Sequence, residues 1–185
     1  MIRDHKKGFG IISILFHWIS AIGIVTLLGT GLYVTNIGYR QGTAFEVSRF
    51  HYALAVIIFF VFVIRLLWRL TNKTPESLSN STPLKVSVYL SKLFLYVLTF
   101  ALMISGYILC TSEGQTLNVF GWFEFPSLML FDTPQVGLAS YVHTYGSWIL
   151  IGLILIHILG AIYHQIIKKD KTLLRMIKPL KKDQR

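Results

Sequence analysis

The stretch that decides the fold lies at residues 49–70 and reads RFHYALAVIIFFVFVIRLLWRL. Its central part is a long apolar run, with His51 near one end and Arg65 near the other. About 20 apolar residues of α-helix cross the roughly 30 Å hydrocarbon core of a bilayer. We therefore expect a membrane-spanning helix over about residues 47–70.

Three further stretches of the 185-residue chain pass the same test, at about residues 11–35, 86–110 and 139–167. The first is too long for the apolar part of a signal peptide, and no small-residue cleavage pattern follows it, so we expect it to remain as an anchor. Four spans leave no room for a second domain. The sequence therefore predicts an all-α protein with a single membrane domain over residues 1–185, a four-helix transmembrane bundle that ends in a basic tail at 168–185.

Composition narrows the class of protein further. Hydrophobic residues make up 54% of the chain and charged residues only 14%, whereas soluble domains carry about a quarter charged residues. This excludes a disordered chain and argues against an ordinary soluble enzyme. Cys110 is the single cysteine, so neither an internal disulfide nor a thiolate cluster can form. Any cofactor must be held by histidine, carboxylate or backbone groups.

The distribution of basic residues predicts the orientation. The chain has 18 Lys and Arg against 8 Asp and Glu, and all the basic residues except Arg40 and Arg49 lie in the N-terminal tail, around the connection at 71–85, or near and in the C-terminal tail. By the positive-inside rule we expect both termini and this connection in the cytoplasm. Because the basic residues flank helix ends and do not form one domain face, we expect membrane lipid, and no nucleic acid, as a partner.

Four of the six histidines lie inside the expected spans: His17, His51, His143 and His157. Ionisable groups at membrane depth commonly mark functional sites, although each could simply hydrogen-bond a neighbouring helix. His143 and His157 are fourteen residues apart, within about 40° of one helix face and about 21 Å apart along the axis. The alternating helix directions then place His17 with the inner histidines of the last span and His51 with His143. Depth alone does not decide whether His157 or His164 is the inner partner.

Paired imidazoles without thiolates suit the axial ligation of haem iron in a helical bundle. Gly146 and Gly160 each follow a histidine of the last span by three positions, on the same face. They would let a flat porphyrin approach the helix, or they serve ordinary helix packing. A haem with imidazole on both sides has no open coordination position, so such a protein would move single electrons.

The chain resembles the bacterial cytochrome b561 family at LFHW (15–18), at the 49–70 stretch, at HTYGSWILIGLILIH (143–157) and at HQIIKKDKTLLRM (164–176). The resemblance covers all four spans in order. It implies a multi-pass protein of the bacterial inner membrane with two b-type haems. The implied inner ligands are His17 and His157, which selects His157 over His164, and the implied outer ligands are His51 and His143. The best-studied relative is similar to a superoxide oxidase, which implies transfer of electrons from superoxide outside to ubiquinone in the membrane.

Three residues are candidates for a quinone site beside the inner haem: Trp18, Arg65 and His164. Arg65 lies inside the apolar run, where a guanidinium would bind haem propionates or a quinone; alternatively it reaches the cytoplasmic headgroups, as we expect for Arg69. His164 could carry the proton that quinone reduction needs, or be an interfacial histidine with no such role.

The outer side holds a long connection at residues 111–138, which contains aromatic side chains and no Lys or Arg. We expect it to cover the outer haem or to anchor the chain at the membrane interface. The two outer arginines face four outer carboxylates, and this net negative charge disfavours rapid capture of the superoxide anion. Arg49, two residues before His51, is the candidate catalytic residue for superoxide.

Two other functions fit parts of this pattern. One is a pure electron carrier, a membrane-anchor cytochrome b subunit that passes electrons between a partner dehydrogenase or hydrogenase and the quinone pool. The other is a transporter that uses its intramembrane histidines as a proton relay. A transporter of this kind would bind no haem, whereas an anchor subunit would copurify with its catalytic partner.

Overall fold

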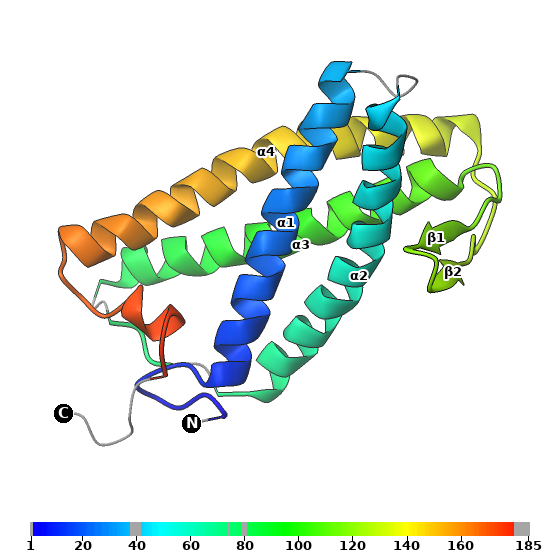
Figure 1. The fold of residues 1–185 in the computed structure, drawn as a ribbon. Helices are drawn as coiled ribbons and strands as arrows, with labels where there is room; N and C mark the ends of the chain where they lie inside the picture. The colour runs from blue at the N-terminus through cyan, green and yellow to red at the C-terminus, as the bar shows by residue number, and fades with distance from the viewer. Residues whose placement is uncertain (1, 38–41, 74, 79–80, 180–185) are drawn as a thin grey trace. The chain divides into compact units, whose positions relative to one another are not determined.

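The computed structural model describes residues 2–37, 42–73, 75–78 and 81–179. Its helices are α1 (Ile11–Ile37), α2 (Thr43–Thr71), α3 (Thr82–Thr111) and α4 (Thr133–Ile166), and a short 3-10 helix, η1 (Leu174–Met176), follows them (Figure 1). All four long helices have the length and apolar character needed to cross a membrane. The expected all-α fold with four transmembrane helices is confirmed.

Several helices begin earlier than the apolar runs suggested, and α4 shows why. Its expected start was at about residue 139, but Asp132 and Gln135 form a capping box before that point. The Gln135 backbone N–H donates to the Asp132 side chain at 2.9 Å, and the Asp132 N–H donates to the Gln135 side chain at 3.0 Å. This reciprocal pair satisfies amides that the first helical turn would leave unbonded. Capping chemistry therefore sets the start of α4, which hydropathy alone does not detect.

The four helices present large apolar side chains outward. Leu70, Leu138 and Trp148, for example, expose 73%, 65% and 60% of their surface. A water-soluble protein seldom exposes apolar patches of this extent. The exposed surface therefore fits contact with lipid chains and agrees with the membrane assignment.

The chain divides into two compact units, and each contains a segment of all four long helices. The first unit comprises residues 1–21, 61–95 and 152–185, and the second comprises residues 22–60 and 96–151.

In the first unit, three segments that are far apart in the sequence contact one another. The Glu76 N–H donates to the Lys6 carbonyl at 2.8 Å, and Arg175 Nη1 donates to the Glu76 carbonyl at 2.9 Å. The indole N–H of Trp18 donates to the Met176 carbonyl at 2.7 Å. The N-terminal segment, the α2–α3 connection and the C-terminal segment thus meet, as the expected topology requires. The side of the membrane on which they lie stays a prediction.

In the second unit, the α3–α4 connection contains a hairpin of β1 (Leu117–Val119) and β2 (Phe123–Phe125), which pair antiparallel. Phe120 and Gly121 in its turn have φ angles of +53° and +75°, the left-handed conformation that tight hairpin turns require. The buried side chains of Leu117 and Val119 pack against Val56 of α2. The aromatic connection is thus folded onto the helices of its own unit.

Candidate haem sites and their surroundings

The first histidine pair consists of His17 on α1 and His157 on α4, both in the first unit. Their ring centroids are 6.3 Å apart and their planes are inclined by 53°. Arg65 Nη2 lies 3.1 Å from His17 Nδ1. Because a guanidinium can only donate, Nδ1 accepts this bond and the ring proton lies on Nε2.

The second histidine pair consists of His51 on α2 and His143 on α4, both in the second unit. Its ring centroids are also 6.3 Å apart, with planes inclined by 75°. His143 Nδ1 lies 3.0 Å from the Leu102 carbonyl, which can only accept. The proton of His143 is therefore on Nδ1, and the lone pair of its Nε2 is available to bind a metal.

His51 reaches the same state through Thr30. The Thr30 hydroxyl donates to the Thr26 carbonyl at 2.9 Å and lies 2.9 Å from His51 Nδ1. Since its proton is already used, the hydroxyl accepts from Nδ1 of His51. Both rings of the second pair therefore keep Nε2 unprotonated, which is the tautomer of a metal ligand.

The spacing of both pairs fits one metal ion held between two imidazoles. A metal–imidazole bond of about 2 Å, with a further 1.1 Å or so from the ring nitrogen to the ring centre on each side, separates the two centroids by about 6.2 Å. Each pair is separated by 6.3 Å. The residues thus fit a six-coordinate haem at each pair. At the first pair, the bond from Arg65 to His17 Nδ1 must first be exchanged for another acceptor.

Two glycines lie against the rings of the second pair. A Cβ atom on Gly106 of α3 would lie 2.9 Å from Cε1 of His143, and one on Gly31 of α1 would lie 3.4 Å from Cε1 of His51. The missing side chains therefore make room for the two imidazoles. Gly106 was not predicted from the sequence, because α3 contains no histidine from which the spacing of a glycine could be counted.

The glycines that sequence spacing had suggested have different surroundings. A Cβ atom on Gly146 would lie 3.0 Å from a methyl group of Leu102 and 3.3 Å from one of Leu98, so this glycine serves close packing of α4 on α3. A Cβ atom on Gly160 would meet no described atom within 4 Å. Of these two glycines, Gly160 is the one that leaves open space on α4.

The two arginines at the end of α2 are held differently. Arg65 contacts His17, as given above, and its guanidinium lies 5.9 Å from the centre of the Phe62 ring. Arg69 Nη1 lies 3.7 Å from Asp4 Oδ2, and the Asp4 side chain is completely buried. Asp4 also accepts hydrogen bonds from the Gly10 N–H and the Ser13 hydroxyl. Arg69 thus belongs to a network that holds the N-terminal segment, whereas Arg65 faces the first histidine pair.

His164 forms a pair that sequence reasoning did not identify. Its Nδ1 lies 2.5 Å from Oδ2 of Asp170, and the two side chains are 19% and 24% exposed. Burial alone would raise the pKa of Asp170, but hydrogen bonds from Thr172 and His164 hold that pKa below its ordinary value. Lys169, with a φ of +52°, turns the chain back so that Asp170 reaches the helix end.

Trp18 and Arg65 both contact His17, and the Trp18 ring lies edge-on to it at 5.4 Å between centroids. The contacts described for His164 run to Asp170 and Tyr163. Of the three candidate quinone residues, the structure therefore joins two directly at the first histidine pair. The third has a carboxylate partner of its own.

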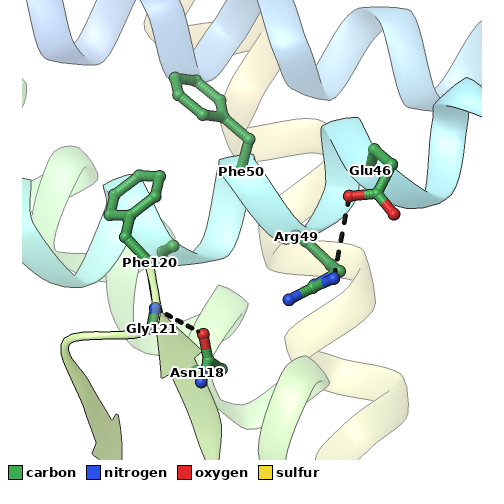
Figure 2. Close-up of a pocket in the computed structure, with 7 residues that line it drawn as sticks. Glu46, Arg49, Phe50, Asn118, Phe120 and Gly121 are labelled. Atoms are coloured by element: carbon green, nitrogen blue, oxygen red, sulfur yellow. Dashed lines mark hydrogen bonds and ion pairs between the residues drawn. The ribbon is translucent and has the colours of Figure 1, made fainter.

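A cavity of about 490 Å³ lies in the second unit between α2 and the hairpin (Figure 2). It is lined by Glu46, Arg49, Phe50, Ala53, Asn118, Phe120 and Gly121. Arg49 Nη1 lies 3.8 Å from Glu46 Oε2, and the two side chains are 48% and 69% exposed. Phe50 and Phe120 meet edge-on at 5.7 Å between centroids. The segment of α2 that carries His51 therefore contributes a cation, a carboxylate and one aromatic ring to the cavity, and the hairpin contributes the second ring.

The chain is similar to characterised proteins along most of its length. Residues 8–179 match the family model of prokaryotic cytochrome b561. Cytochrome b561 homolog 2 of Escherichia coli (strain K12) is 33% identical over 172 residues, which cover 92% of each chain. A Yersinia pestis protein named "Probable superoxide oxidase CybB" is 25% identical over 181 residues, 94% of this chain and 97% of the relative.

The close approach of Gly106 to His143 predicts the effect of adding a side chain. We expect Gly106→Val to displace the His143 ring and to lower the haem content of the purified protein by about half, since one of two sites loses a ligand. Gly137→Val, which adds the same side chain where no described atom lies within 4 Å, is the control and should retain the haem content of the wild type. The measurement is the ratio of haem to protein in the absorption spectrum. Equal haem content in both variants would contradict the assignment of His143.

Proposed function

Because the chain belongs to the prokaryotic cytochrome b561 family of membrane electron-transfer proteins, we propose that it is a two-haem superoxide:ubiquinone oxidoreductase. Electrons would pass from superoxide on the periplasmic side to ubiquinone in the bilayer. The family carries b-type haem, and four candidate membrane spans fit a multi-pass protein of the bacterial inner membrane. The observation that carries the proposal is the pair of equal histidine spacings, one in each unit.

The protein's own residues prepare these two sites. His17 and His157 would hold one haem, and His51 and His143 the other. A b-type haem with imidazole on both faces supplies a reversible one-electron couple and no open position for oxygen. The Thr30 hydroxyl accepts a hydrogen bond from Nδ1 of His51 and so orients that ring. The Leu102 carbonyl accepts the corresponding hydrogen bond from Nδ1 of His143.

The proposed orientation places both termini in the cytoplasm and the second histidine pair toward the periplasm. It is supported by the concentration of basic residues in the two tails and around the α2–α3 connection. The contacts among these three segments in the first unit agree with it. In this orientation Arg49 would lie toward the periplasm and His164 toward the cytoplasm.

On the periplasmic side, Arg49 would attract the superoxide anion and Glu46 would oppose it. The carboxylate of Glu124 adds to this opposition, because hydrogen bonds from Asn118 and Thr116 keep its pKa below the ordinary value. Arg49 is half exposed and lies two residues from His51. The name of the Yersinia pestis relative supports superoxide as the electron donor.

On the cytoplasmic side, reduction of ubiquinone consumes two electrons and two protons. Trp18 and Arg65 border the first histidine pair and would bind the quinone ring and carbonyl groups. His164, hydrogen-bonded through Nδ1 to Asp170, keeps Nε2 for proton exchange.

An alternative is a membrane-anchor cytochrome b subunit that exchanges electrons with a partner dehydrogenase or hydrogenase. The α3–α4 connection favours it, because Trp122, Leu128 and Leu130 expose 75%, 72% and 74% of their surface. These side chains could contact another subunit as well as lipid. Affinity purification from native membranes separates the two functions, since an anchor subunit would bring its catalytic partner with it.

Removal of single histidines tests the ligand assignment. We expect His143→Ala to lose one haem and retain the other, since the first histidine pair stays intact. His157→Ala should lose the other haem. His164→Ala should keep two haems per chain, because its imidazole is engaged by Asp170. Haem content and the α-band spectrum measure these outcomes; loss of a haem in His164→Ala, with two haems retained in His157→Ala, would reverse the inner assignment.

The charge balance at the cavity predicts how superoxide reduces the protein. At low ionic strength we expect Arg49→Gln to slow haem reduction by superoxide about threefold to fivefold and Glu46→Gln to accelerate it by a similar factor, as one surface charge contributes roughly 1 kcal/mol. High salt should reduce both effects. Stopped-flow mixing measures the rates, with Glu113→Gln as a control outside the cavity. Unchanged rates in both variants would remove Arg49 from the donor site, and no haem reduction at all would favour the anchor subunit.

The His164–Asp170 pair predicts a defect at the quinone step. His164→Gln and Asp170→Asn should each slow the reoxidation of reduced haem by a short-chain ubiquinone about tenfold or more, because proton transfer loses its positioned acid. His5→Gln, which alters a histidine of the N-terminal segment, is the control and should reoxidise at the rate of the wild type. Normal reoxidation in both variants would show that protons reach the quinone by another route.

A further inference from the structure

The two histidine pairs differ in the charge that contacts them. At the first pair, the guanidinium of Arg65 lies 3.1 Å from Nδ1 of His17. Haem binding would exchange this hydrogen bond for another acceptor, and the positive charge would stay on α2 beside the first pair. Arg65 also acts electrostatically on His157, as does Lys92 of α3. The first histidine pair is therefore placed in a positive local field.

The hydrogen-bond partners of the second pair are neutral. His51 binds the Thr30 hydroxyl, and His143 binds the Ser105 hydroxyl and the Leu102 carbonyl. Arg49 lies on the same helix as His51, but it is half exposed and ion-paired with Glu46. Its charge is therefore screened by solvent and by its own counter-ion.

A fixed cation near a redox centre stabilises the state with the additional electron. The effect is large where the surroundings are apolar, because little solvent screens the charge. Arg65 meets this condition, since it lies in the apolar run of α2 and its guanidinium faces His17 and the Phe62 ring. An arginine also remains charged at every physiological pH.

We propose that Arg65 holds the reduction potential of the haem at the first histidine pair above that of the haem at the second. This inference rests on the two-haem function proposed above. It assigns a direction: an electron that enters at the second pair comes to rest at the first. One electron moves and no bond forms or breaks, so the second site is oxidised as the first is reduced. Arg65 would then act through its charge on the reduction potential of the first haem. This role does not depend on which donor supplies the electron.

The alternative is that Arg65 only anchors the cofactor. In that case Arg65→Gln would lower haem content and leave the reduction potential of any bound haem unchanged. A tuning role instead lowers the potential of one haem while it remains bound. Arg65→Lys separates the two roles further, because it keeps the charge and loses the planar, bidentate geometry of the guanidinium.

The test is a redox titration of the purified holoprotein, followed by the α-band absorption, with chemical mediators and without superoxide or quinone. His143→Ala retains the first site alone and so assigns one of the two wild-type potentials. We expect the first site to have the higher potential. Arg65→Gln should change the distribution of one electron between the sites at least tenfold toward the second, a shift of about 59 mV for a one-electron couple. Arg65→Lys should restore most of it.

Arg49→Gln is the matched control, because it removes the same charge from the second unit. It should leave the potential of the first site unchanged. Equal potentials in the wild type, a higher potential at the second site, or an equal shift of both sites in Arg65→Gln would overturn the proposal. If Arg65→Gln fails to bind haem at the first site, Arg65→Lys is titrated in its place, and a first-site potential at or below that of the second site in that variant would overturn the proposal as well.

These results are distinguishable from a failure of the proposed function. If the protein binds two haems, with the higher reduction potential at the first site, and does not react with superoxide, the role of Arg65 stands and superoxide is excluded as the electron donor. A protein with one haem would overturn the two-haem function itself.

Discussion

The constraint on which the rest of the structure depends is the need of the two imidazoles of the second histidine pair for a hydrogen-bond partner at Nδ1. In hydrocarbon an unsatisfied polar group costs several kcal/mol. Thr30 of α1 and the Leu102 carbonyl of α3 satisfy this need for His51 and His143. Helices that carry no ligand of the second pair thus determine which nitrogen of each ring is free. The tautomer, and with it the capacity to bind iron, is a property of the surrounding helices.

The sequence predicted the four spans because a run of about 20 apolar residues is rare outside membrane-spanning helices. Helix direction and depth also predicted that His51 lies with His143, whereas the choice of His157 over His164 as the partner of His17 came from the family resemblance. The structure places the rings in those combinations, and their role as ligands stays a prediction. Asp170 was missed because its contact with His164 depends on the left-handed backbone of Lys169. The hairpin was missed because its three-residue strands are too short to show an alternating pattern.

The arginines show most clearly where sequence reasoning ends. Arg49, Arg65 and Arg69 lie on one helix, and spacing alone cannot separate their roles. In the structure, Arg49 pairs with an exposed carboxylate, Arg69 pairs with a buried one, and Arg65 contacts an imidazole. The same kind of side chain thus carries a solvent-screened charge at Arg49, holds the N-terminal segment at Arg69, and lies beside a candidate haem ligand at Arg65. The partners of these arginines include residues of other segments of the chain. Hydropathy and helical periodicity do not predict contacts between distant segments.

The division of the chain into two units has a consequence for biosynthesis. Every segment of the second unit precedes residue 152, whereas the first unit needs residues 152–178, including His157 and the Met176 carbonyl that binds Trp18. Both histidines of the second pair, His51 and His143, are therefore synthesised before His157, the partner of His17 in the first pair. The order of the segments along the chain thus completes the residues of the second histidine pair before those of the first unit, whose contacts through Trp18 and Arg175 need residues 175 and 176.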